Sequence, residues 1–207
     1  MTEEDENVGT EHRLDRTLAI SDGVFAFAIT LLVLDLTVPT IMNATSADLL
    51  KALSTDYITF FTYALSFLIA GVWWNAHHRN FEHIRQSNTT LRWLNLLFLL
   101  WIALLPFFTK ILSHYQDVPL GVILYAVDQA SAGIFLTLIW IYASNHHLVD
   151  KNMKEKTIRY ATIRNMIAPI FFLASMGIAF INPIVATVFW VGMFPVQLII
   201  RRFEQKK

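Results

Sequence analysis

Residues 16–36, RTLAISDGVFAFAITLLVLDL, decide the fold class of this 207-residue chain. Residues 18–38 are almost continuously apolar, and a helix needs about 20 such residues to cross the hydrocarbon core of a bilayer. Two carboxylates, Asp22 and Asp35, interrupt the apolar run near its ends. Ionisable groups are rare inside membrane spans and are functional candidates there. The stretch therefore predicts a membrane helix whose few polar groups have specific tasks.

The composition of the whole chain agrees with a membrane protein. Hydrophobic residues make up 55% of the chain, charged residues 15%, and the mean hydropathy is +0.48. A soluble domain carries roughly 25% charged residues, so this chain could not cover a water-facing surface. The net charge of zero argues against a nucleic-acid partner, which needs a basic face. Because cysteine is absent, the chain has no disulfide, no thiol chemistry and no Cys-ligated metal.

Five further apolar segments follow the first, and each is long enough for a membrane helix. The six predicted spans are residues 18–38, 57–75, 93–112, 119–143, 161–181 and 185–200. A tight turn at Asn182-Pro183 makes the last two a hairpin, and Pro195 interrupts the sixth. The predicted organisation is an acidic cytoplasmic tail (1–16), a six-helix transmembrane domain (17–200) and a basic cytoplasmic tail (201–207). The fold class is an all-α integral membrane protein.

Loop charges orient the spans. All but two of the 16 Lys and Arg residues fall on one side, and only Lys51 and Lys110 fall on the other. The positive-inside rule places the basic side in the cytoplasm, so we expect a multi-pass cell-membrane protein with both termini cytoplasmic. In the loops, Ser46 is expected to N-cap a short outer helix. Residues 145–160 are expected to prolong span four or five as a cytoplasmic helix.

Polar residues gather at the cytoplasmic ends of the first three spans. Asp22 is either a helix-start carboxylate near the interface or the centre of a polar clamp. We favour the clamp because His, Asn and Trp N–H groups at the same depth can hydrogen-bond Asp22. The predicted network consists of Arg16, Ser21, Asp22, Trp74, His77, His78, Trp93 and Asn95. Asp35 is either an interfacial carboxylate or part of an outer vestibule that attracts cations.

Asp128 and Gln129 lie in the middle of span four. A lone Asp at that depth must be protonated, paired or in contact with water, and it could contact another subunit or the first span. His77, His78 and His83 do not share one helix face at their spacing, so no metal site is predicted. The sequence contains no Gly-rich phosphate loop, HExxH or GxSxG motif, and no enzyme is predicted.

One stripe of the first span is nearly apolar. By the 100° step of a helix, Thr30, Leu31 and Leu34 lie within about 60° of Phe27. Periodicity alone does not distinguish a helix-packing face from a hydrophobic constriction, which controls conduction in channels by dewetting.

Three motifs in order resemble the transmembrane protein 175 family of potassium channels. Residues 16–22, RTLAISD, are similar to the family's Arg, three residues, then Phe-Ser-Asp. Residues 72–84, VWWNAHHRNFEHI, resemble its Trp-x-x-His-His segment, and residues 91–112, LRWLNLLFLLWIALLPFFTKIL, its Leu-Asn-Leu…Leu-Pro pattern. The resemblance implies six spans per subunit, a homotetramer of the bacterial type, a pore lined by the first helices, potassium as the permeant ion and no cofactor.

The resemblance also assigns tasks to residues. It implies a constriction at Phe27, a hydroxyl layer that meets the ion at Thr30, and further apolar layers at Leu31 and Leu34. It also implies that Arg16, Ser21 and Asp22 hold the helices together through the His and Trp residues of spans two and three. Two positions depart from the family pattern, because Ile20 replaces the signature Phe and Phe27 replaces the usual Ile or Leu.

The predicted function is a potassium-permeable cation channel with modest selectivity over sodium, since no rigid oxygen cage is present. The alternative is a proton-coupled secondary transporter that uses Asp22, Asp128 and the histidines as a relay. A third hypothesis, a membrane enzyme with a site at His77, His78 and Asp22, has weaker support because it matches no motif.

Overall fold

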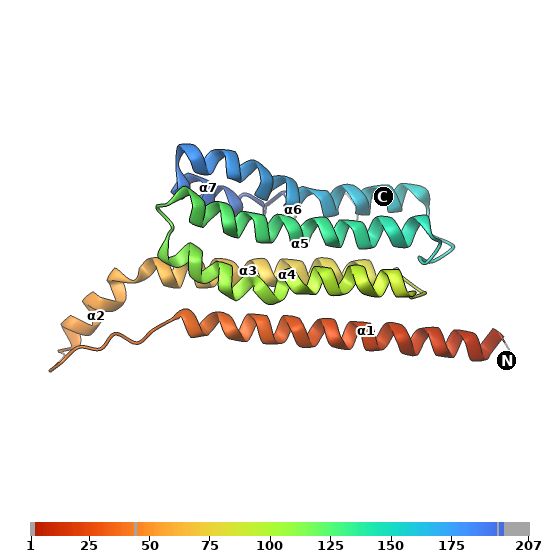
Figure 1. The fold of residues 1–207 in the computed structure, drawn as a ribbon, viewed down its shortest axis with the longest axis horizontal. Helices are drawn as coiled ribbons and strands as arrows, with labels where there is room; N and C mark the ends of the chain where they lie inside the picture. Colours follow the sequence, from red (N-terminus) through yellow and green to blue (C-terminus); the bar gives the residue numbers. More distant parts are fainter. Residues whose placement is uncertain (1–2, 44, 194, 197–207) are drawn as a thin grey trace.

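The structure is a computed structural model that describes residues 3–43, 45–193, 195 and 196. In these residues all regular secondary structure is helical, as predicted, apart from one isolated β-bridge. The elements are α1 (Glu3–Leu31), η1 (Leu32–Asp35, a 3₁₀ turn), α2 (Ser46–Thr55), α3 (Tyr57–Phe81), α4 (Thr89–His114), α5 (Pro119–Asn145), α6 (Glu155–Ile181) and α7 (Pro183–Val191) (Figure 1).

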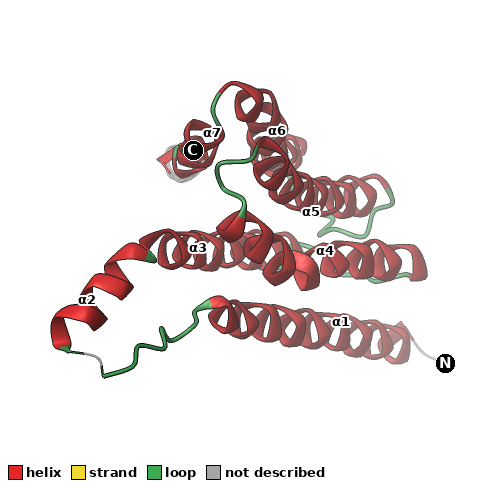
Figure 2. Cartoon of the chain, turned by 60° about the vertical axis from the view of Figure 1, so that its left-hand side comes forward, coloured by secondary structure: helices red, strands yellow, loops and turns green. Residues whose placement is uncertain are grey.

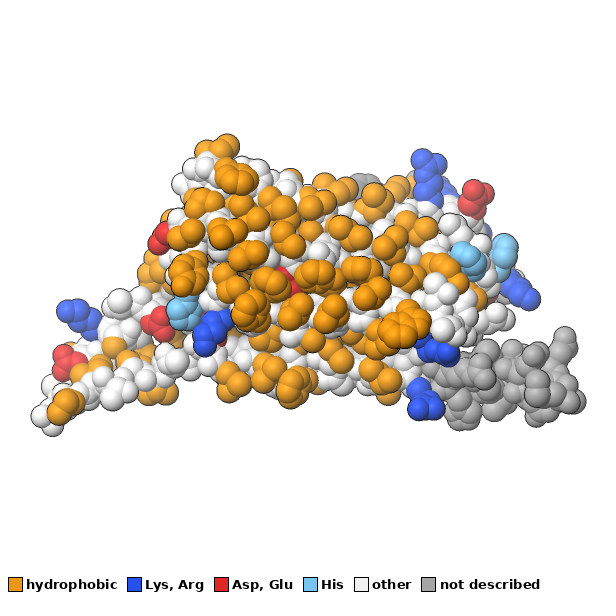
Figure 3. All heavy atoms as spheres, in the orientation of Figure 1, with side chains coloured by type: hydrophobic (Ala, Val, Ile, Leu, Met, Phe, Trp, Pro, Cys, Tyr) orange, Lys and Arg blue, Asp and Glu red, His pale blue; other side chains and the backbone are white. Residues whose placement is uncertain are grey.

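Five helices in the described part of the chain are long and apolar enough to cross a membrane. They are Leu14–Asp35, α3, α4, α5 and α6. The sixth predicted span begins as α7, and its residues 194 and 197–200 lie outside the described residues, as does the tail 201–207. Figure 3 shows hydrophobic side chains across the middle of one face, with charged side chains mainly at its two ends. This distribution is the one that a bilayer imposes.

The helices pack in layers (Figures 1 and 2). Helix α1 packs on α3 and α4, α5 packs on α4 and α6, and α7 closes against α6 and α5. Within the subunit, α5 is therefore the central helix, whereas α1 lies at the edge with much of its surface uncovered. Helix α2 projects from one end of the bundle and contributes no buried residue.

Several helix boundaries differ from the predicted spans. Helix α1 already begins at Glu3, so the predicted acidic tail is largely helical, and the span ends in a 3₁₀ turn at Asp35 instead of at Val38. Helices α3 and α4 extend beyond their apolar segments into polar sequence. Hydropathy locates the hydrocarbon core, whereas the backbone hydrogen-bond ladder can continue into water.

The α3–α4 loop and the α5–α6 loop pair with each other. The amide of Arg85 donates to the carbonyl of Leu148 at 2.8 Å, and the amide of Asp150 donates to the carbonyl of His83 at 3.0 Å. An antiparallel bridge joins Ile84 to Val149 between these bonds. The prediction of a continuous helix over 145–160 is therefore wrong for 146–154, because these backbone groups bond across to the α3–α4 loop. The part from Glu155 onward is helical as expected.

The short helix α2 forms where expected, with a different N-cap residue. Thr45, not Ser46, is the N-cap, and its hydroxyl accepts from the amide of Asp48 while the Asp48 carboxylate accepts from the amide of Thr45. Ser46 is the first helical residue. This capping box satisfies two backbone donors at the helix start, which a Ser46 cap with Asp48 only two residues later does not do.

Candidate functional site

Helix α1 has two faces of opposite character. Phe25, Ala28 and Leu32 are each 1% exposed and form the face that packs into the subunit. Phe27 and Leu34 lie on the uncovered face, 65% and 70% exposed. This division follows the 3.6-residue period of a helix, since 25, 28 and 32 recur every three or four positions.

The predicted stripe follows the uncovered face. Thr30 is exposed, Leu31 is half-buried, and Ile20 extends the apolar surface toward the N-terminus at 55% exposure. The Thr30 hydroxyl donates to the carbonyl of Phe27 at 2.9 Å. Its proton is thereby engaged inside the helix, so the oxygen lone pairs remain available on the uncovered side. Asp35 ends the 3₁₀ turn and is half-buried.

A chain of hydrogen bonds joins α3, α4 and α1. His77 Nε2 on α3 lies 2.8 Å from Asn95 Oδ1 on α4. Asn95 Nδ2 donates to Ser21 Oγ on α1 at 3.0 Å, and Ser21 Oγ donates to the carbonyl of Thr17 at 2.9 Å. Because Asn95 donates through its nitrogen, its oxygen accepts from an N–H at His77 Nε2. The whole chain is buried, which strengthens each bond.

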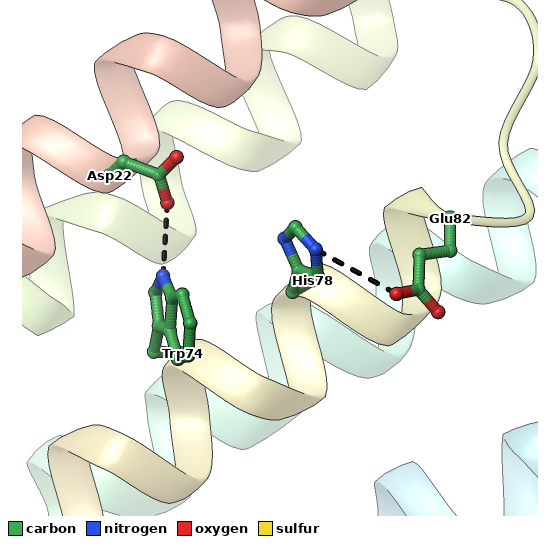
Figure 4. A network of polar contacts seen from close by, with 4 residues as sticks. All are labelled: Asp22, Trp74, His78 and Glu82. Atoms are coloured by element: carbon green, nitrogen blue, oxygen red, sulfur yellow. Dashed lines mark hydrogen bonds and ion pairs between the residues drawn. The ribbon is translucent and has the colours of Figure 1, made fainter.

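Asp22 belongs to a second, more exposed group (Figure 4). Trp74 Nε1 donates to Asp22 Oδ1 at 2.9 Å and so connects α3 to α1. The His78 ring stacks on the Trp74 ring with centroids 5.7 Å apart, and His78 Nε2 lies 3.7 Å from Glu82 Oε1. The predicted clamp residues of α1, α3 and α4 thus divide into a buried chain of hydrogen bonds and a more exposed group around Asp22 and Trp74.

Two of the predicted network residues stand apart from both groups. Arg16 is exposed on α1 and Trp93 is 62% exposed on α4. Within the described part of the chain, neither side chain makes a hydrogen bond or ion pair with the residues of the two groups. Both side chains therefore lie on the surface of the described chain.

Two phenylalanines that the sequence analysis did not single out enclose His77. The His77 ring stacks on Phe81 with centroids 4.3 Å apart and on Phe98 at 5.4 Å. Helical spacing could have indicated both contacts, because Phe81 is four residues after His77 and Phe98 is three residues after Asn95, and residues so spaced are neighbours on a helix. The aromatic walls keep water away from the His77–Asn95 bond.

The described residues contain no group of three or more His, Asp or Glu side chains that could hold a metal ion. The bundle of apolar helices and the polar anchors of α1 define a multi-pass helical membrane protein, and comparison with known proteins identifies its family.

The sequence profile of the family described as "Endosomal/lysosomal potassium channel TMEM175" matches residues 16–106. A protein of Streptomyces collinus named as a potassium channel is 33% identical over 172 residues, 81% of this chain and 82% of that protein. The mouse protein named "Endosomal/lysosomal proton channel TMEM175" is 29% identical over 199 residues, 95% of this chain but 38% of its own length.

A crystal structure of a lysosomal potassium-selective channel TMEM175 homolog from Chamaesiphon minutus has the same fold. Its TM-score is 0.78 at 24% identity, and the match covers 92% of this chain and 97% of that chain. The chain belongs to the TMEM175 family of ion channels, as a member of the bacterial type.

Proposed function

We propose that this chain forms a potassium-permeable cation channel as a homotetramer, with the uncovered face of α1 lining the pore and both termini in the cytoplasm. The observation that carries the proposal is this exposed face, where Phe27, Thr30 and Leu34 line up on a helix whose opposite face is fully packed. The names of the bacterial relatives support potassium as the permeant ion.

Assembly also accounts for the polar groups that α1 leaves uncovered. Asp22 and Arg16 are exposed on a helix that is apolar enough to span a membrane. Charged groups facing lipid are costly, so a helix with these residues favours protein or water as its neighbour. A ring of four subunits around α1 supplies both, since neighbouring chains cover one side and the pore lies on the other.

Permeation would rely on an apolar neck and a hydroxyl layer. Four Phe27 rings narrow the pathway and disfavour a continuous water column, as hydrophobic constrictions do. Thr30, whose hydroxyl proton is held by the Phe27 carbonyl, offers oxygen lone pairs one turn further along α1. Leu31 and Leu34 continue the apolar layers, and Asp35 concentrates cations at the outer mouth. Such a pore lacks a rigid oxygen cage, so its selectivity over sodium is modest.

The test is a bi-ionic recording of the purified protein in a planar bilayer, with potassium on one side and sodium on the other. We expect unitary currents that reverse on the potassium-selective side. Phe27→Ala should raise the unitary conductance because it widens the neck, while the matched variant Phe67→Ala on α3, a helix that the proposal does not place at the pore, should not; Phe67 is 43% exposed. Equal conductance in wild type and Phe27→Ala would show that Phe27 does not form the constriction. A silent bilayer with saturable, pH-driven uptake in liposomes favours the transporter instead.

A further inference from the structure

A second polar cluster lies inside the subunit, away from the uncovered face of α1. Trp73 Nε1 on α3 donates to Gln129 Oε1 at 2.7 Å, and Gln129 Nε2 donates to Asp128 Oδ2 at 2.7 Å. Asp128 is 0% exposed, which places it inside this subunit instead of at its surface. Its second oxygen, Oδ1, has no hydrogen-bond partner among the described residues.

Uncharged groups surround Asp128. On its own helix, Tyr125 lies one turn away, and the Tyr125 ring stacks on Trp190 of α7, which in turn contacts Phe172 of α6. Tyr125 OH lies 3.1 Å from Ser66 Oγ on α3, and Ser66 Oγ accepts from Thr109 on α4 at 2.9 Å. The described residues of α7 include no titratable side chain.

Among the described residues, no titratable or cationic side chain on the packed helices bonds to Asp128. On α6, Arg164 precedes Pro169 by five residues, and Pro169 faces Gly133, which follows Asp128 by five residues on the antiparallel α5. Arg164 therefore lies about 15 Å from Asp128 along the helix axes. On α4, Lys110 is exposed at the outer end, and on α3, His77 lies one turn beyond Trp73.

A buried carboxylate with no cation beside it and one oxygen unpaired is strongly disfavoured, whereas the neutral acid is not. The Gln129 amide donates to Oδ2, which leaves Oδ1 as the oxygen that can bear a hydrogen. From this geometry we propose that Asp128 is a proton-binding site, one in each subunit and separate from the pore, and that it carries its proton on Oδ1 when α3 and α5 pack as described.

Release of this proton would loosen the α3–α5 contact. The proton leaves to water, and the carboxylate left behind must gain water or a cation, for which the closed packing provides no partner. Trp73, which is joined to Asp128 by two hydrogen bonds through Gln129, lies one turn from His77 on α3. His77 is the start of the hydrogen-bond chain to α1, so the site is connected to the helix that the proposed function places at the pore.

Infrared spectroscopy of the protein in liposomes tests the site without any need for conduction. A neutral carboxylic acid has a C=O stretching band above the amide I band, and a carboxylate does not. We expect this band at neutral pH in wild type and in Asp117→Asn, which removes an exposed carboxyl in the outer loop. The band should disappear in Asp128→Asn and shift in frequency in Asp128→Glu, which keeps the acid. Unchanged spectra in both Asp128 variants overturn the proposal, and if Asp128→Asn does not fold, the Asp128→Glu shift alone decides.

The connection to the pore rests on the proposed function and has its own readout. In wild type, raising the pH should change the open probability through a step that Asp128→Asn removes, because the Asn side chain stays neutral at every pH. An identical pH profile in both proteins, together with loss of the infrared band in Asp128→Asn, keeps the proton site and rejects its link to conduction. Absence of current in both proteins rejects the proposed function, and the infrared test of the proton site remains valid because it does not depend on conduction.

Discussion

Asn95 connects three helices through the oxygen and the nitrogen of its side-chain amide. Its amide oxygen and nitrogen are both committed, to His77 on α3 and to Ser21 on α1. All three side chains are buried, so bulk water cannot reach them to replace either hydrogen bond. Removal of one partner from a buried pair costs the desolvation of the group left behind, which exceeds the net contribution of the bond itself.

Asn95→Ala should therefore destabilise the protein by about 1–3 kcal/mol, because it leaves the His77 N–H without an acceptor and the Ser21 oxygen without the donor from Asn95. The measurement is the thermal unfolding midpoint in detergent. Asn75→Ala is the matched control, since Asn75 is exposed and, among the described residues, its side chain bonds only to the carbonyl of Gly71 on its own helix. Equal midpoints for the two variants would show that the buried chain does not stabilise the bundle.

At the scale of elements, a close helix crossing in the described structure involves Gly133 on α5. A Cβ at this position would lie 2.7 Å from Pro169 Cδ on α6 and 2.8 Å from a ring carbon of Trp73 on α3. Both neighbours are rigid rings, so neither can move aside without shifting its helix. Small residues at helix crossings allow this approach of backbones in membranes.

Gly133→Ala should cost about 1–3 kcal/mol of stability, the usual range for overpacking a close-packed core. Gly177→Ala on α6 serves as the control, because a Cβ there meets nothing within 4 Å in the subunit. Thermal unfolding of the two variants measures the difference. A Gly133→Ala protein as stable as Gly177→Ala would mean that α3, α5 and α6 separate easily at this crossing.

Helix α2 provides a pH-dependent prediction outside the membrane spans. The hydrogen bond from the Thr45 hydroxyl, and secondly that from the Thr45 amide, lower the pKa of Asp48 below its ordinary value. Since the folded pKa is the lower one, the capping box stabilises α2 above the unfolded pKa and is lost as the pH falls through the folded pKa. In a ¹³C-carboxyl NMR titration, Thr45→Ala should move the midpoint of Asp48 upward. Asp56→Asn, elsewhere in the same loop, should leave that midpoint in place.

At the scale of the whole molecule, the asymmetry of charge predicts the orientation. Lys51 lies on the sparsely charged side and Lys151 on the densely charged side. In the structure these residues stand at opposite ends of the bundle, since Lys51 belongs to α2 and Lys151 to the α5–α6 loop.

Labelling of single cysteines can test this orientation directly, because the chain contains no native cysteine. A membrane-impermeant maleimide added to intact cells should label Lys51→Cys and should label Lys151→Cys only after lysis. The reverse pattern would place the termini outside. The wild-type chain, with no thiol, provides the background signal.

The amino-acid sequence by itself determined the local features of this protein. Apolar length places the spans, Pro119 begins α5 where expected, and Asn182-Pro183 marks the predicted boundary between α6 and α7, since Pro suits a first turn and Asn caps one. All of these follow from interactions between residues close in the chain or from the length of the bilayer.

Only the tertiary structure decided which polar groups meet. Membrane helices are apolar on nearly every side, so their pattern does not reveal which face turns toward which neighbour. His77 could not be paired with Asn95 rather than with Asp22 from spacing alone, and Gln129 could not be matched with Trp73. The loop pairing of Ile84 with Val149 likewise depends on α3 and α5 ending side by side. These contacts join residues far apart in sequence, and the packing of whole helices selects them.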